Sequence, residues 1–256
     1  MNEYHRYHRQ NTSITYRCAI RTERSSMSSL SIAETKHSWR AGPYMVAIPF
    51  TVIVYALSLR STGLGAVGVP IGAAVGLGWA LLLGFIAARV GRHQGWNAKV
   101  EDALVFVGVI ATAFLLCGGI MASLLIGGAL NEPSTTYETL SALMFPTLPY
   151  FIISNSLMEL FVIPAIVFFG WRSGTRRILL LWSVAAYFAM RVWTYLVYAE
   201  NRIETATGAL SAEDVQWYKD TLAVDYRPVL IAVMLILLLL AAFLPARSWA
   251  SRSRRS

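Results

Sequence analysis

The sequence predicts an all-α fold, a polytopic membrane bundle of six transmembrane helices. Hydrophobic residues make up 56% of the 256 residues and charged residues only 14%, whereas about 25% of the residues of an ordinary soluble domain are charged. The mean hydropathy is +0.52. The apolar residues are gathered in long runs, several of them of about 20 residues, which is the length that crosses the roughly 30 Å hydrocarbon layer of a bilayer.

The apolar runs define a six-helix domain, residues 43–246, between two polar ends. Residues 1–42 are rich in Lys, Arg, Ser and Tyr. Because they have little apolar surface to bury, we expect a disordered basic cytoplasmic segment. Residues 247–256 are expected to form a basic cytoplasmic tail. The expected spans are 43–59, 66–88, 103–130, 150–170, 178–198 and 228–244.

The basic residues lie at alternate ends of these spans. The N-terminal segment, the second and fourth loops and the C-terminal tail hold 17 of the 22 Lys and Arg residues. Positive charge is retained on the cytoplasmic side of membrane proteins, so both termini are expected in the cytoplasm, in the plasma (cell inner) membrane. The same distribution accounts for the net charge of +8 without a nucleic-acid partner.

Glycines and short polar stretches predict local structure between and within the spans. Gly68, Gly72 and Gly76 follow one another at intervals of four in the second span, a spacing that lets two helices approach closely within lipid. A glycine-rich turn is expected at 61–65, before that span. Residues 140–145 are expected to form a short interfacial or re-entrant helix before the fourth span.

Two loops have a composition that bears on function. The acidic fifth loop, 199–226, contains Ser211 followed by acidic residues, which resembles a helix start. We therefore expect a short amphipathic helix that carries Trp217 at the membrane interface. The second loop, 89–102, is basic and is long enough for only a short helix.

The cysteines and histidines argue against several classes of site. Cys18 and Cys117 are far apart and no CxxC is present, so a thiol–disulfide enzyme is not expected. All four histidines lie outside the apolar spans, which removes the usual ligands of a haem or a metal held between helices. The sequence therefore predicts no cofactor and no metal site. The histidines are His5, His8, His37 and His93.

One acidic and one basic residue stand inside the fourth and fifth spans. Glu159 lies about 13 Å below the outer end of its helix and Arg191 about 10 Å below the outer end of the next, at about 1.5 Å per residue. Consecutive helices joined by a short turn pack as neighbours, so the two side chains are expected to form an ion pair. Charges inside a bilayer are costly and commonly mark functional sites. Glu159 and Arg191 are therefore the candidate catalytic residues.

Polar and aromatic side chains accompany both charged residues. Asn155 and Ser156 precede Glu159 by four and three residues, on the same helix face. The fifth span carries a similar stripe. Together the stripes predict a pocket that opens toward the outer surface beneath the acidic loop. The residues expected to bind substrate are Asn155, Ser156, Tyr187, Tyr195, Asn201, Trp217 and Arg227, and the rim is expected to include Arg202, Asp225 and Tyr226 as well.

Two interpretations of the charged pair stay open from the residues alone. In one, the ion pair only sets the register of two helices. In the other, it lines a pocket that binds a lipophilic or weakly polar molecule. Tyr198 is assigned equally well to the stripe or to the belt of aromatic residues at the membrane interface.

The second half of the chain carries three short motifs. Asn201 follows the penultimate span, the acidic loop contains Trp217, and the stretch 225–227, Asp-Tyr-Arg, precedes the last span. In this layout residues 103–256 resemble the anthrone oxygenase-like family of small four-helix integral membrane proteins. The resemblance implies oxygenation of an activated aromatic molecule without a cofactor.

Three functions are compatible with these features. The first is an enzyme that oxygenates, cyclises or isomerises a lipophilic small molecule, with Glu159 as general acid or base and Arg191 binding an oxygen. The second is a permease-type transport subunit, which would need a cytoplasmic coupling helix. The third is a non-catalytic membrane anchor or assembly factor. The expected partners are the lipid bilayer and a lipophilic ligand. Nucleic acid is not expected, and a homo-oligomer is left open.

Overall fold

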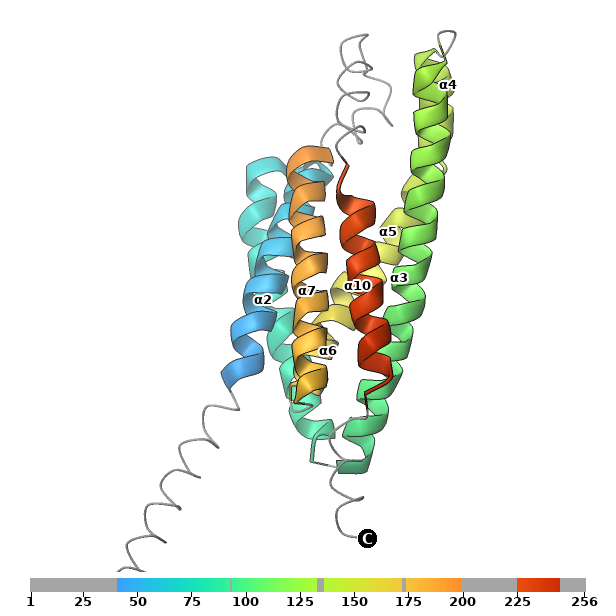
Figure 1. Ribbon diagram of the computed structural model, residues 1–256. Helices are drawn as coiled ribbons and strands as arrows, with labels where there is room; N and C mark the ends of the chain where they lie inside the picture. Colours follow the sequence, from blue (N-terminus) through green and yellow to red (C-terminus); the bar gives the residue numbers. More distant parts are fainter. Residues whose placement is uncertain (1–40, 93, 133–135, 172–173, 199–224, 245–256) are drawn as a thin grey trace, which may run out of the picture. The chain divides into compact units, whose positions relative to one another are not determined.

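The computed structural model describes residues 41–92, 94–132, 136–171, 174–198 and 225–244, and all its regular elements there are helices. The chain divides into two units, Met1–Pro43 and Tyr44–Ser256, and the packing below is that of the second. The first helix is Ala41–Leu59. The next elements are η1 (Arg60–Leu64), α2 (Gly65–Val90), α3 (Gln94–Asn131), α4 (Tyr137–Met144), α5 (Thr147–Leu157), η2 (Met158–Val162), α6 (Ile163–Gly170), α7 (Thr175–Trp193), η3 (Thr194–Tyr198) and α10 (Arg227–Ala242), where η denotes a π-helical turn (Figure 1).

Among the described residues, which form helices and no strands, five helical stretches are long and apolar enough to cross a membrane, and this places the chain in the membrane class. They are Ala41–Leu59, Gly65–Val90, Trp96–Asn131, Thr147–Gly170 and Thr175–Tyr198. The predicted sixth span corresponds to α10, a shorter apolar helix of 16 residues. The expected disordered N-terminal segment and basic tail, and the amphipathic helix of the acidic loop, lie outside the described residues.

Several predicted boundaries are wrong in the same direction, because helices extend past the apolar runs. The expected basic connection 89–102 shrinks to 91–93, since α3 begins at Gln94. The fourth span begins at Thr147 and the fifth at Thr175. The glycine-rich turn 61–65 is largely helical: η1 leads directly to Gly65, whose φ of 53° reverses the chain into α2. The short helix expected at 140–145 is present as α4.

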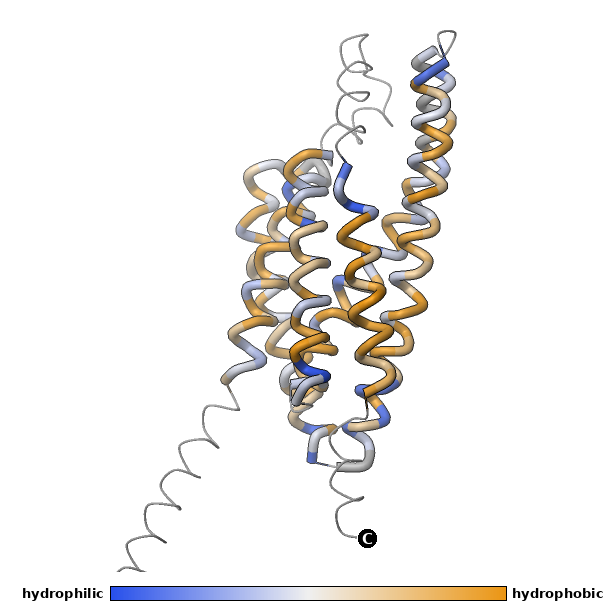
Figure 2. Tube along the Cα trace, in the orientation of Figure 1, coloured by the Kyte–Doolittle hydropathy of each residue, from blue (hydrophilic) through white to orange (hydrophobic). Residues whose placement is uncertain are grey.

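Apolar side chains lie on both the inside and the outside of the bundle. In Figure 1, α10 lies between α7 and α3, and it packs against both. The buried core includes Leu115, Met158 and Leu238, each at most 2% exposed. Large apolar side chains also point outward, for example Phe85 and Leu124, and hydrophobic residues cover most of each helix in Figure 2. Such a contiguous apolar exterior suits lipid rather than water.

The glycine stripe of α2 is the contact surface with the first helix, as its spacing predicts. A Cβ atom added at Gly68, Gly72 or Gly76 would collide with backbone atoms of the helix Ala41–Leu59. The two backbones are therefore close enough that only glycine fits between them, the arrangement that small residues four apart allow. Gly78, in contrast, faces open space.

Gly72→Ala is therefore expected to destabilise the protein, whereas Gly78→Ala is not. The new methyl group would meet the backbone of Tyr55 and Ala56, and overpacking of this kind costs about 1–3 kcal/mol. Thermal unfolding in detergent measures the difference between the two variants. Equal midpoints for both would show that the first helix and α2 are not in backbone contact.

Candidate functional site

A cavity of about 360 Å³ lies among the helices and contains most of the residues that the sequence singled out. This volume is within the range of small-molecule sites. Its wall is mainly apolar, with a minority of polar groups. The lining residues are Ser58, Ser61, Leu115, Gly119, Ala122, Ser123, Ile126, Leu148, Phe151, Ile152, Asn155, Ser156, Glu159, Met190, Arg191, Thr194, Tyr195, Asp225, Arg227, Pro228 and Ile231.

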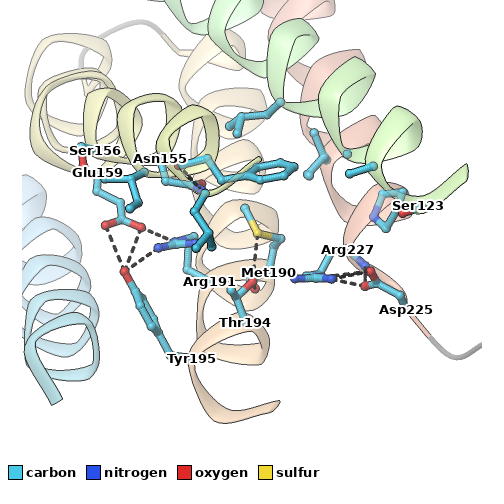
Figure 3. Close-up of a pocket in the computed structure, with 18 of the residues that line it drawn as sticks. Ser123, Asn155, Ser156, Glu159, Met190, Arg191, Thr194, Tyr195, Asp225 and Arg227 are labelled. Carbon is cyan, nitrogen blue, oxygen red and sulfur yellow. Dashed lines mark hydrogen bonds and ion pairs between the residues drawn. The ribbon is translucent and has the colours of Figure 1, made fainter. Parts of the chain in front are cut away.

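The predicted ion pair is present and forms one wall of this cavity. Nε of Arg191 donates to Oε1 of Glu159, and each side chain is 8% exposed. Nη2 of Arg191 donates to the hydroxyl of Tyr195 at 2.5 Å, and that hydroxyl lies 3.3 Å from Oε2 of Glu159. Figure 3 shows the three side chains converging from two helices. The carboxylate, guanidinium and phenol thus form one closed hydrogen-bonded network.

Proline explains why the helix widens at Glu159. Pro164 has no N–H group, so the carbonyl of Leu160, four residues earlier, loses its intrahelical partner, and the proline ring would clash with that carbonyl. The chain responds with the π-helical turn η2, in which the N–H of Ile163 bonds to the carbonyl of Met158, five residues back. Such turns are rare and occur frequently at functional sites. Tyr195 lies in another π-helical turn, η3.

Side chains from two other helices bind the carbonyl groups of η2. The indole Nε1–H of Trp79, on α2, donates to the carbonyl of Leu160 at 2.5 Å. The hydroxyl of Tyr55, on the first helix, donates to the carbonyl of Glu159 at 3.5 Å. The first two helices therefore hold the irregular turn that carries the candidate catalytic carboxylate.

Trp79→Phe is expected to lower the stability of the protein by about 1 kcal/mol, the usual net contribution of one hydrogen bond, since it leaves a partly buried carbonyl without its donor. Trp182→Phe is the matched control, because Trp182 is 64% exposed on the apolar exterior. Thermal unfolding of the two variants in detergent tests the difference. A loss in Trp182→Phe as large as that in Trp79→Phe would remove the role assigned to the indole hydrogen bond.

Asn155 and Tyr187 form a layer behind the ion pair. The Tyr187 hydroxyl lies 3.3 Å from Oδ1 of Asn155, and Nδ2 of Asn155 donates to the carbonyl of Phe151 at 2.8 Å. Asn155 reaches the cavity, whereas Tyr187 is 1% exposed and does not line it. Tyr187 therefore contacts Asn155 behind the cavity wall and is not a lining residue, whereas the sequence predicts that it contacts the substrate.

A second ion pair lines the cavity at the start of α10. Nε and Nη2 of Arg227 donate to both carboxylate oxygens of Asp225, at distances of 2.7–3.0 Å. The guanidinium carbon lies 3.6 Å from the centre of the Tyr198 ring. Tyr198 is 1% exposed in the protein, so it belongs to this buried cluster rather than to an exposed aromatic belt.

The structure brings together more of the wall than the sequence indicates. Seven of the predicted residues line the cavity: Asn155, Ser156, Glu159, Arg191, Tyr195, Asp225 and Arg227. Asn201, Trp217 and Arg202 lie outside the described residues, and Tyr226, 58% exposed, does not line the cavity. The hydroxyl-bearing residues Ser58, Ser61, Ser123 and Thr194 are additional. Of these, Thr194 could have been found from spacing, since it follows Arg191 by three residues and so shares a helix face with it.

The cavity contains two carboxylates and two guanidinium groups, so its formal charges balance. Among the described residues, no three His, Cys, Asp or Glu side chains are grouped so that they could hold a metal ion. Comparisons of the chain with protein-family models, with curated proteins and with solved structures give no significant match. The function must therefore be argued from the cavity itself.

Proposed function

We propose that this chain is an integral membrane enzyme that binds an uncharged lipophilic small molecule in the cavity and transfers protons to or from it through Glu159. The observation that carries the proposal is the Glu159–Arg191–Tyr195 network in the wall of a mainly apolar cavity. Apolar walls bind the body of such a molecule, and a few polar groups fix its orientation. Intramembrane charges with no such task are rare.

The proposed chemistry is an isomerisation or cyclisation that starts at a carbon next to a carbonyl group. Glu159 would take a proton from that carbon, while an N–H of Arg191 binds the carbonyl oxygen on which negative charge develops. Return of the proton to another atom completes the reaction without any other reactant. The resemblance to anthrone oxygenase-like proteins supports a related alternative, in which the carbanion formed in this way reacts with oxygen.

The proposal includes six spans that cross the plasma membrane, with both termini in the cytoplasm. The charge distribution supports this topology, as does the packing of α10 against two membrane-length helices, α7 and α3. The 16 residues of α10 correspond to a length of about 24 Å at about 1.5 Å per residue, compared with the roughly 30 Å hydrocarbon layer of a bilayer. A permease subunit is less well supported, because α2 and α3 are joined through 91–93 alone, which has no room for a coupling helix.

Deuterium exchange tests the proposal without knowledge of the natural substrate. Purified protein in lipid nanodiscs is incubated in heavy water with aromatic cyclic ketones such as α-tetralone and anthrone, and mass spectrometry follows the label. We expect the wild type to accelerate deuterium incorporation beside the carbonyl and Glu159→Gln to reduce that rate by about 100-fold, the usual contribution of general acid–base catalysis. A gain of oxygen mass would instead identify the oxygenase.

Two controls separate catalysis from folding. Glu138→Gln replaces an exposed carboxylate on α4 and should exchange like the wild type. Ser123→Phe fills the cavity, whereas Leu124→Phe changes the neighbouring residue, which is 67% exposed on the exterior. We expect Ser123→Phe to abolish exchange and Leu124→Phe to preserve it. Equal exchange rates in the wild type and in all four variants would refute the proposed function.

A further inference from the structure

The cavity is lined by two arginines that come from different helices. Arg191 belongs to α7 and is paired with Glu159, and Arg227 begins α10 and is paired with Asp225. In Figure 3 the two networks lie apart, with Met190 and Thr194 between them. A molecule that fills the cavity would therefore meet one guanidinium group in each of two places.

Within the described part of the chain, neither guanidinium group uses all of its N–H donors. Arg191 donates through Nε and Nη2, and Arg227 also donates through Nε and Nη2. For Nη1 of either arginine, the described part of the chain provides no hydrogen-bond partner. Both arginines line the cavity, and among the described residues neither Nη1 is one of the fully buried polar atoms that lack a partner, since that group contains Nε of Arg176 alone. Arginine offers donors only, so a ligand with an acceptor at each end would complement the described wall of the cavity.

The charge of the cavity determines what kind of acceptor fits. Each arginine already has a carboxylate at hydrogen-bonding distance, so an anionic ligand would bring a third negative charge into a mainly apolar space. Burying a charge without a counter-charge costs several kcal/mol. A neutral oxygen, such as a carbonyl, accepts a hydrogen bond from a guanidinium group without that cost, and hydrogen bonds to charged groups contribute about 1.5–3 kcal/mol.

We propose that the ligand of this cavity is an uncharged lipophilic molecule with two oxygen acceptors, one bound by Arg191 and the other by Arg227. This inference rests on the proposed function, since it describes the molecule on which Glu159 would act. The oxygen at Arg191 is the one next to the carbon that loses its proton. The oxygen at Arg227 holds the far end of the molecule and is what distinguishes the substrate from a simple ketone.

A matched set of aromatic compounds tests the second acceptor. The parent diketones are para-diacetylbenzene and the longer para,para′-diacetylbiphenyl. In each, one acetyl group is replaced by isopropyl to give a monoketone, both are replaced to give a hydrocarbon, and one is replaced by carboxylate to give a keto acid. Calorimetric titration of the protein in nanodiscs gives Kd for each compound with wild type, with Arg227→Gln and with Arg89→Gln, an exposed arginine outside the cavity.

At one of the two lengths, the diketone is expected to bind wild type and Arg89→Gln about tenfold more tightly than the monoketone, as one further hydrogen bond to a charged group predicts. Arg227→Gln should remove that advantage while its Kd for the hydrocarbon is unchanged, which shows that the cavity is intact. Equal affinities of diketone and monoketone at both lengths, or tightest binding of the keto acid, would overturn this inference but not the proposed function. Failure of every compound to bind wild type would overturn both.

Discussion

Arg191→Gln is expected to lower the stability of the protein by about 3–5 kcal/mol, the usual consequence of removing one partner of a buried ion pair. The side chains of Arg191 and Glu159 are each 8% exposed, and they contact each other directly. Without the guanidinium group, Glu159 keeps only the hydroxyl of Tyr195 as a side-chain donor among the hydrogen bonds described above. Its charge would then be poorly compensated in a mainly apolar surrounding.

The double variant Glu159→Gln/Arg191→Gln is expected to recover most of that loss. Both charges are then absent, and two amide side chains of similar size occupy their places. The measurement is a double-mutant cycle of thermal unfolding in detergent, with the two single variants, the double variant and the wild type. Contacting residues show coupling energies of about 0.5–3 kcal/mol in such cycles, and we expect the upper part of that range here.

The cycle also decides between the two interpretations of the pair that the sequence left open. Strong coupling together with normal deuterium exchange in the double variant would make the pair a purely structural device. Strong coupling with loss of exchange supports a pair that is both structural and catalytic, as we propose. A loss below about 1 kcal/mol in Arg191→Gln, the value typical of exposed pairs, would contradict burial of the pair and indicate that water in the cavity solvates both charges.

Arg176→Gln is expected to have the second-largest effect, a loss of about 3 kcal/mol. The expected spans 150–170 and 178–198 leave Arg176 in the fourth loop, whereas the helix already begins at Thr175. The residue belongs to the first turn of α7, is 2% exposed, and contacts Glu101 of α3 at 3.3 Å and Asp102 at 2.5 Å. Glu101 is 3% exposed, so a buried carboxylate would lose its contact with the Arg176 guanidinium group. The loss is at the low end of the range because Asp102, 49% exposed, remains solvated.

Arg177→Gln is the control for this prediction, because the neighbouring arginine is only partly buried and stacks on Trp171. The double variant Glu101→Gln/Arg176→Gln should regain part of the stability lost in Arg176→Gln. Thermal unfolding in detergent measures all of them. If Arg177→Gln proved as destabilising as Arg176→Gln, the basic residues would act through the membrane surface and not through the contact with α3.

The sequence alone determined the class of this protein, its principal charged pair and its closest helix contact. Each depends on a local property: the length of an apolar run, the depth of Glu159 and Arg191 along consecutive helices, and the four-residue spacing of Gly68, Gly72 and Gly76. A bilayer penalises unpaired charge and favours close backbone contact between small residues. Few other arrangements of the helices are therefore compatible with these local patterns.

Tertiary structure decided where the helices end and what encloses the site. The apolar runs do not reveal that α3 begins at Gln94, because polar residues at a helix end are tolerated at the membrane surface. No pattern in α3 marks Ser123 as a cavity residue or Glu101 as the partner of Arg176. Such contacts depend on the rotation of each helix about its axis, and in a lipid-facing bundle both faces of a helix are apolar.

The π-helical turn η2, which carries Glu159, likewise depends partly on the sequence and partly on the tertiary structure. Pro164 alone predicts that the helix is disturbed near Leu160, but proline is compatible with a kink, a break or a π-helical turn. The carbonyl groups freed by the disturbance are bound by Trp79 of α2 and Tyr55 of the first helix. Partners so distant in sequence exist only after the bundle has assembled. The charged residues of the site were thus readable from the chain, while the cavity that unites them with the rest of its wall is a product of packing.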